Sequence, residues 1–402
     1  MGYSSGLEGQ EGQEGQEGYS ASGLFPGYIK GGRSPASTLL PGVDPATAVA
    51  LVKTREALHH ASERIEWSPR RASAGLPDLG SADRLAQWSL DIRSINFMTE
   101  LMGPLQISAN RDEASYTVNH WAADAEKTGK EIPVVTIIRP LPSLFEGQVQ
   151  MVVDYAALRS ERLQEVVTEI GIPVQFWAAI MDLNPTTTPY TLELLALGYA
   201  FASAITQPCK HTLGAPRPEN YSPSVQPVIN PRRFGAFPSG HATEAFLTAR
   251  MLQLVSQQDP PPITPGGVEN EPKLEQQLQR LAMRIAVNRT VAGVHFPIDS
   301  TAGRMLGETL ATYLAYRCGN PDSCQGWTPR VFDGQRDRDG NPIKTWTRDF
   351  DRHDALDGWT NSVPFFWRNN GTKSGPQKTW TVVKDGESLL NWLWVQAQKE
   401  WV

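Results

Sequence analysis

The chain has 402 residues, enough for one large domain or two ordinary ones with a substantial buried core. Its 40% hydrophobic and 20% charged residues are the balance of a soluble globular protein, and they exclude a disordered chain or an integral membrane protein. The formal net charge of -6 excludes a broad nucleic-acid-binding surface, because clustered Lys and Arg hold phosphate backbones. Any anion site must therefore be local.

Residues 1–35 are predicted to form a disordered, low-complexity tail. The EGQ triplet repeats between Glu8 and Gly18, and Gly-rich polar sequence of this kind cannot bury enough area to offset chain entropy. The start also lacks the basic region and the apolar run of a secretory signal. We therefore expect a soluble protein that is cytoplasmic rather than secreted.

Helical patterns dominate residues 36–318, which we interpret as one domain. Asp44 and Pro45 are a cap and a first-turn residue, so a helix is expected to follow them through Ile65. Apolar periodicity predicts further helices at 147–169, 188–210, 239–256, 272–291 and 300–316. Long strand-type alternation is scarce, so the expected fold class is all-α, a helical bundle assembly.

No membrane contact is expected from these helices. The most apolar stretch, 190–205, is interrupted by Glu193 and is shorter than the roughly 20 apolar residues that cross a bilayer. The three cysteines, Cys209, Cys318 and Cys324, are too few for a disulfide framework and favour a reducing compartment. A bridge between Cys318 and Cys324 stays open.

Residues 319–402 form a third segment, an irregular Trp-rich C-terminal extension that we expect to pack on the helical domain. Eight of the 12 tryptophans lie between Trp327 and Trp401, among Gly, Asp, Asn and Thr turn residues. Tryptophan is usually a large packing residue, although an aromatic carbohydrate-binding surface is an alternative.

Three segments combine helix-end geometry with cationic or imidazole side chains: 210–218 (KHTLGAPRP), 237–241 (FPSGH) and 289–299 (RTVAGVHFPID). Ser239 is placed to cap a helix, so that the first-turn N–H groups, beginning with Gly240, face an anion with the helix dipole behind them. Lys210, Arg217 and Arg289 add three positive charges, and arginine donates two parallel hydrogen bonds to oxyanion oxygens. These features together predict a site for one tetrahedral oxyanion.

Two histidines add chemistry that a simple oxyanion carrier does not need. His295 stands four residues before Asp299, which can accept a hydrogen bond from one ring nitrogen while the other ligates a metal or attacks phosphorus. His241, one residue after Gly240, suits proton transfer to an attacking or leaving oxygen. A carboxylate is expected behind the arginines, and Asp154 is the candidate.

Together these motifs resemble the signature of the vanadium haloperoxidases and the type-2 phosphatidic acid phosphatases: Lys-x6-Arg-Pro, then Pro-Ser-Gly-His, then Arg-x5-His-x3-Asp. The resemblance covers roughly residues 150–318 and implies a helical bundle, of which 36–318 would be the catalytic domain. It implies that Lys210, Arg217, Ser239, Gly240 and Arg289 bind vanadate, with phosphate able to occupy the same site. His295 would be the axial vanadium ligand and His241 the acid or base.

The resemblance implies either of two activities. A vanadate-dependent haloperoxidase would use hydrogen peroxide to oxidise a halide to a hypohalous acid, which halogenates a small organic substrate. An acid phosphatase would instead form a phosphohistidine at His295. Phe234, five residues before Ser239, resembles the chloroperoxidase arrangement, and this favours the peroxidase. Gln207 stands where the chloroperoxidases have Trp, so bromide is the expected halide. A homo-oligomer is left open, and no nucleic-acid or membrane partner is expected.

Overall fold

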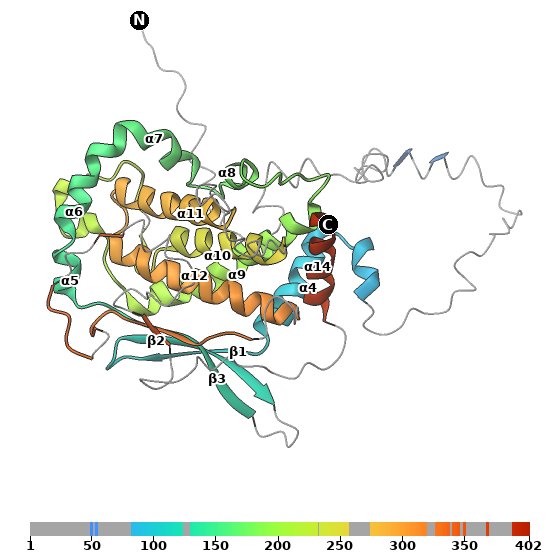
Figure 1. Cartoon of the computed structure of the whole chain (residues 1–402), viewed down its shortest axis with the longest axis horizontal. Coiled ribbons are helices and arrows are strands. Elements are labelled where there is room, and N and C mark those ends of the chain that lie inside the picture. The colour runs from blue at the N-terminus through green and yellow to red at the C-terminus, as the bar shows by residue number, and fades with distance from the viewer. Residues whose placement is uncertain are drawn as a thin grey trace, which may run out of the picture.

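The computed structural model of the chain describes residues 49–50, 53–54, 82–123, 129–231, 233–256, 274–319, 326–337, 340–345, 349–350, 367–369 and 388–402. Helices form the body of the molecule and a sheet covers one side of it (Figure 1). Residues 1–35, most of the helix expected after Asp44, and Cys324 of the suggested bridge lie outside the described residues.

Four long helices make the centre of the fold: α9 (Pro189–Leu213), α10 (Gly240–Val255), α11 (Leu274–Val291) and α12 (Pro297–Cys318). The predicted helices at 188–210, 239–256, 272–291 and 300–316 are thereby confirmed, with α12 starting three residues early because Pro297 occupies its first turn. Helix α9 is apolar nearly all round, which is typical of a helix buried on every side. Its C-terminal cap, Gly214, adopts the left-handed conformation that ends many helices.

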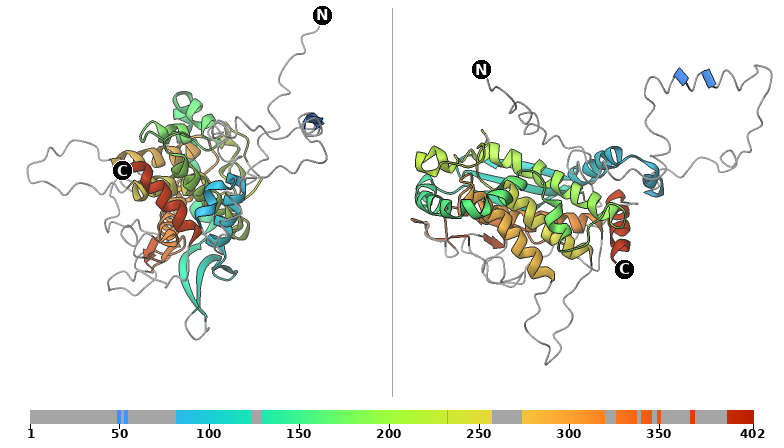
Figure 2. Two further views of the ribbon diagram at one scale, coloured as in Figure 1. Left: turned by 90° about the vertical axis from the view of Figure 1, so that its right-hand side faces the viewer. Right: turned by 90° about the horizontal axis from the view of Figure 1, so that it is seen from above.

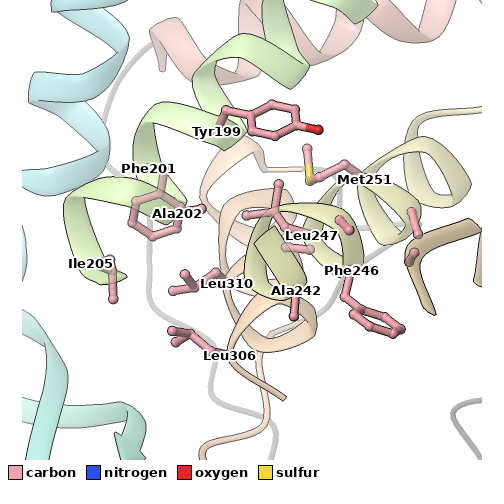
Figure 3. Close-up of a cluster of buried hydrophobic side chains, with 14 of the residues drawn as sticks. Tyr199, Phe201, Ala202, Ile205, Ala242, Phe246, Leu247, Met251, Leu306 and Leu310 are labelled. Atoms are coloured by element: carbon pink, nitrogen blue, oxygen red, sulfur yellow. The ribbon is translucent and has the colours of Figure 1, made fainter. Parts of the chain in front are cut away.

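Apolar side chains of α9, α10 and α12 interlock in the core. Figure 3 shows Phe201 and Ile205 of α9 with Leu247 of α10 and Leu306 and Leu310 of α12, all of them fully buried. Close packing between α10 and α12 depends on glycine, because a Cβ at Gly303 would lie 2.6 Å from the backbone oxygen of Ser239. This approach fixes the start of α10 against α12.

One buried ion pair explains the charge within the apolar stretch of α9. Glu193 accepts two hydrogen bonds from Arg93 of α4 (Leu90–Met102), at 2.8 Å to Nε and 2.6 Å to Nη2. Both side chains are almost fully buried, so the pair joins α4 to α9 where two unpaired charges would be costly. No helix in the described part of the chain is long and apolar enough to cross a membrane.

A five-stranded mixed sheet corrects the all-α prediction. Its order is β1 (Leu105–Asn110), β2 (Ser115–Ala123), β3 (Gly129–Ile138), β4 (Arg330–Asp333) and β5 (Trp367–Asn369), with only β3 and β4 parallel. The β2–β3 hairpin extends beyond the helices (Figures 1 and 2). The sheet packs on the bundle through β2 against α9 and β3 against α12.

The helix predicted at 147–169 is wrong in its continuity. The chain instead forms α6 (Val149–Asp154), a 3-10 turn η2 (Tyr155–Leu158) and α7 (Arg159–Thr168). The turn carries Arg159 to backbone oxygens of Val225 and Val291, at 2.7 and 2.9 Å. Tertiary hydrogen bonds thus favour a bend over one straight helix, and the chain wraps around the end of the bundle (Figure 1).

Shorter elements complete the described chain. These are η1 (Ala82–Gln87), α5 (Pro142–Glu146), α8 (Val174–Ala178), η3 (Pro218–Asn220), η4 (Pro223–Val225), α14 (Leu389–Gln398) and η5 (Lys399–Trp401). Helix α14 packs on α9, α12 and α4, with Leu393 and Trp394 fully buried. Trp327 is also fully buried and donates to the Pro133 oxygen at 2.9 Å. Trp327 and Trp394 therefore serve packing, whereas Trp346, Trp359 and Trp380 lie outside the described residues.

Candidate functional site

A pocket of about 120 Å³ lies where the ends of the central helices meet. The sequence-predicted residues that line it are Lys210, Arg217, Phe234, Gly240, His241, Arg289 and His295. Two further predicted residues, Ser239 and Asp299, adjoin the lining residues Gly240 and His295. Ser239 is fully buried and caps α10, its Oγ accepting from the Ala242 N–H at 3.4 Å, while its own N–H donates to the Asp299 backbone oxygen at 3.0 Å. The structure thus gathers all three sequence segments around one pocket.

Arg289 lies in the last turn of α11, and only one of its three guanidinium nitrogens has a hydrogen-bond partner among the described residues. Its Nη2 donates to Glu169 Oε2 at 2.6 Å and to the Val166 oxygen at 2.9 Å. Nε and Nη1 are buried and have no hydrogen-bond partner among the described residues. Because an unsatisfied buried donor costs about 1–3 kcal/mol, these nitrogens indicate an acceptor-rich ligand.

Lys210 and Arg217 are oriented by backbone oxygens. Lys210 Nζ donates to Ala236 at 2.9 Å, and Arg217 donates to Val294 through Nη1 at 2.9 Å and to Phe234 through Nε at 3.1 Å. Such carbonyls fix the direction of a cation without neutralising its charge. Burial and the neighbouring Arg217 lower the pKa of Lys210. Arg217 and Arg289 nevertheless keep the site locally cationic in a chain of negative net charge.

His295 is hydrogen-bonded to Asp299 through one ring nitrogen. Its Nδ1 lies 2.9 Å from Asp299 Oδ2, which also accepts the Phe296 N–H at 3.0 Å. Burial lowers the pKa of His295 well below its usual range, and the surrounding cations lower it further. Burial also raises the pKa of Asp299 to about 7. Above that pH the Asp299 carboxylate accepts a hydrogen bond from Nδ1 of the neutral ring, so Nε2 keeps its lone pair for a ligand.

His241 is the second residue of α10 and lines the same pocket. Its Nε2 lies 2.9 Å from the backbone oxygen of Glu169, which can only accept, so Nε2 carries a proton. The ring is partly exposed, unlike His295. An oriented imidazole at the edge of an anion pocket can exchange protons with a bound molecule.

Every motif residue in this pocket lies within one segment that matches a known family. Residues 192–321 match the PAP2 superfamily. This superfamily includes vanadium haloperoxidases and phosphatases, and its members are generally enzymes. No curated protein matches the chain. The PAP2 match runs from α9 to just beyond α12, so it contains the cationic side chains and both histidines.

The carboxylate behind the arginines is Glu169, which precedes the PAP2 match, and not Asp154. Asp154 accepts a hydrogen bond from Gln150 on an exposed face of α6. Glu169 is almost fully buried after α7, where its carboxylate holds Arg289 and its backbone oxygen holds His241. Asn288 also donates to it at 2.8 Å. Burial raises the pKa of Glu169 to about 7, although Arg289 opposes the shift.

Phe234 forms part of the pocket wall, as the sequence predicted. Its ring centroid is 5.5 Å from Lys210 Nζ and 5.2 Å from Arg217 Cζ, distances at which a ring face attracts cations. Further wall residues that sequence analysis missed are Ile170, Ile229, Asn230, Pro231, Glu244 and Val294. Gln207 also lines this pocket.

Proposed function

We propose that the pocket binds a tetrahedral oxyanion and that the protein is a vanadate-dependent haloperoxidase. The observation that carries the proposal is Arg289, whose buried Nε and Nη1 lack partners in the described structure while Lys210 and Arg217 line the same pocket. Donors of this kind suit an anion with several acceptor oxygens. Phosphate would bind to the same groups.

The residues present fit vanadate. Lys210, Arg217 and Arg289 would hold its oxygens, with the Gly240 N–H at the start of α10, and His295 Nε2 would be the vanadium ligand. When bound, vanadate supplies a Lewis acid that activates hydrogen peroxide without changing its own oxidation state. Asp299 keeps the His295 tautomer, and His241 would accept a proton from hydrogen peroxide.

Halide oxidation is favoured over phosphate ester hydrolysis by the Phe234 wall. Its ring, with Ile170, Ile229 and Pro231, gives the cationic pocket an apolar side. A halide approaching there loses part of its hydration, which strengthens its attraction to Lys210 and Arg217. We therefore propose a halide, hydrogen peroxide and a small organic molecule as reactants, with bromide as the preferred halide.

A phosphatase is the second candidate, and the His295–Asp299 pair favours it. A neutral His295 with its Nδ1 proton held by Asp299 is also the arrangement of a nucleophile that attacks phosphorus. His241 would then protonate the leaving group.

The two candidates separate in one experiment on the apoprotein. Bromide and iodide oxidation by hydrogen peroxide is measured with and without orthovanadate, beside hydrolysis of p-nitrophenyl phosphate by the same sample. The expected result is halide oxidation that requires vanadate and is inhibited by phosphate. Hydrolysis without vanadate, accompanied by no halide oxidation, would replace the peroxidase with the phosphatase.

A further inference from the structure

A second hollow, the α4–α9 groove, lies between these two helices. Its volume of about 480 Å³ falls in the range of small-molecule sites, about 300–1,000 Å³. None of its described lining residues is charged. The residues that line it are Ser94, Ile95, Met98, Thr99, Ala196, Leu197, Ala200, Ser203, Ala204, Gln207 and Pro208.

Small side chains on one face of α9 leave this space open. Ala196, Ala200 and Ala204 follow one another at intervals of four residues, so they form a row along the helix that faces α4. On the opposite wall, Ile95 is 62% exposed although it is apolar. The groove therefore offers an uncharged, largely apolar surface that would gain from removal of water.

The groove adjoins the oxyanion pocket. Gln207 lines both, and Lys210 follows one helical turn later on the pocket side. A second link is Ser203, a groove residue whose Oγ lies 3.4 Å from Oε1 of Glu244, which lines the pocket. A molecule lying along α9 in the groove would thus have one end beside the cationic pocket.

We propose that the α4–α9 groove binds an uncharged, apolar aromatic substrate and presents one end of it at Gln207. Binding depends only on the groove, whereas the reaction that follows rests on the proposed function. In that reaction hypobromous acid formed at the pocket replaces an aromatic C–H bond with a C–Br bond, and the displaced proton leaves with hydroxide as water. Contiguity with the pocket and the uncharged lining select such a molecule over an anionic one.

Binding is tested without any turnover, using the neutral fluorescent probe N-phenyl-1-naphthylamine and the full chain. Ala204→Phe and Ser94→Trp fill the groove from α9 and from α4. Ile92→Trp is the control, because Ile92 is 48% exposed on α4 and lies outside the groove lining. We expect saturable binding by the wild type, at least about tenfold weaker binding by both filled variants, and no change in the control.

Two parallel measurements make the outcome decisive. Iodide oxidation without organic substrate should be equal in all four proteins, whereas the kcat/KM for bromination of an apolar phenol should fall only in the filled variants. Unaltered probe binding in both filled variants would overturn the proposal. The proposal would also be overturned if sedimentation showed that the wild type is a dimer and that Ser94→Trp dissociates it, because a second copy of the chain would then occupy the groove. Probe binding at the groove with no halide oxidation would refute the proposed function alone.

Discussion

At the scale of single residues, Arg289 is the side chain that we propose holds the anion. Glu169 holds Nη2, and the two nitrogens without partners among the described residues are the donors that we propose for an anion. Replacing Arg289 with Ala should weaken anion binding by about 2–4 kcal/mol, within the range for truncating one partner of a buried charge pair. Arg289→Lys should rescue this only in part, because an ammonium cannot donate two parallel hydrogen bonds.

The anion affinity of both Arg289 variants is measured by vanadate reconstitution and by phosphate competition. Arg336→Ala is the control, since Arg336 is an exposed arginine outside the pocket lining. Unchanged affinity in Arg289→Lys would contradict the role of the planar guanidinium.

His295 and Asp299 act as a pair, so they can be tested as one. His295→Ala should abolish turnover in either proposed activity while leaving the helical fold intact. Asp299→Asn should lower ligand affinity by about 10–100-fold, because the amide no longer enforces the tautomer with its proton on Nδ1. Circular dichroism checks the fold, and activity above a few per cent in His295→Ala would remove His295 from this role.

Glu169 is one source of the pH dependence of anion binding, beside Lys210 and Asp299, whose pKa values burial also brings to about 7. The pKa of Glu169 is raised to about 7, so it is neutral below that pH and negative above it. Lowering the pH through this range removes a negative charge next to Arg289, and anion affinity should rise several-fold. Sulfate is the suitable probe, because it keeps one charge state here. In Glu169→Gln the change between about pH 6 and pH 8 should be smaller, and an identical slope would exclude Glu169 as its source.

The sequence predicted the pocket side chains because short local motifs place them at the ends of neighbouring helices. Glu169 was missed for the opposite reason. Its contact with Arg289 joins residues 120 positions apart, whereas Asp154 lies on α6 before the bend at η2 and contacts Gln150. Residue patterns within one helical turn can be predicted from the sequence, whereas contacts between distant elements cannot.

At the scale of elements, the position of α10 depends on the glycines of α12. A methyl group at Gly307 would overlap the backbone oxygen of Thr243, and that backbone cannot move without shifting the start of α10. Gly307→Ala should therefore destabilise the protein by about 1–3 kcal/mol despite the better helix propensity of alanine, and it should weaken anion binding too.

Gly198→Ala is the matched control for Gly307→Ala. Its Cβ would lie 2.7 Å from Leu247 Cδ2, the far end of a flexible side chain, so we expect little loss of stability. Urea unfolding and phosphate binding distinguish the two variants. Equal stability and equal phosphate affinity in the two variants would mean that the contact between α10 and α12 does not position the pocket residues.

The residue pattern of the strands explains why the sequence did not predict the sheet. Along β2, Tyr116, Val118 and His120 are buried while Thr117, Asn119 and Trp121 are more exposed, which is a period-two pattern. The buried residues include a polar histidine, paired with Tyr313 at 2.8 Å, so hydrophobicity alone hides the alternation. β4 is short and pairs with a strand almost 200 residues away, a contact that no local pattern indicates.

At the scale of the whole molecule, the C-terminal residues stabilise α9, the helix that carries Lys210. Glu400 accepts the Tyr190 and Thr191 N–H groups at 2.7 and 2.8 Å, so a carboxylate from the chain end caps the start of α9. At the other end of α14, Glu100 of α4 accepts the Leu389 N–H at 2.8 Å. The C-terminal segment is thus connected at both ends to the helices of the core.

These connections predict one cooperative unfolding unit in which the chain end contributes to stability. Glu400→Ala leaves two N–H groups of α9 without their acceptor and removes a charge that favours the helix dipole, so it should lower the free energy of unfolding by about 1–2 kcal/mol. Lys399→Ala, at the exposed neighbouring position, should change it by less than about 0.5 kcal/mol. Urea titration followed by both fluorescence and circular dichroism should give one transition, with a lower midpoint only in Glu400→Ala. Two separate transitions, or equal midpoints for the two variants, would show that the C-terminal segment folds as an appended unit and does not anchor α9.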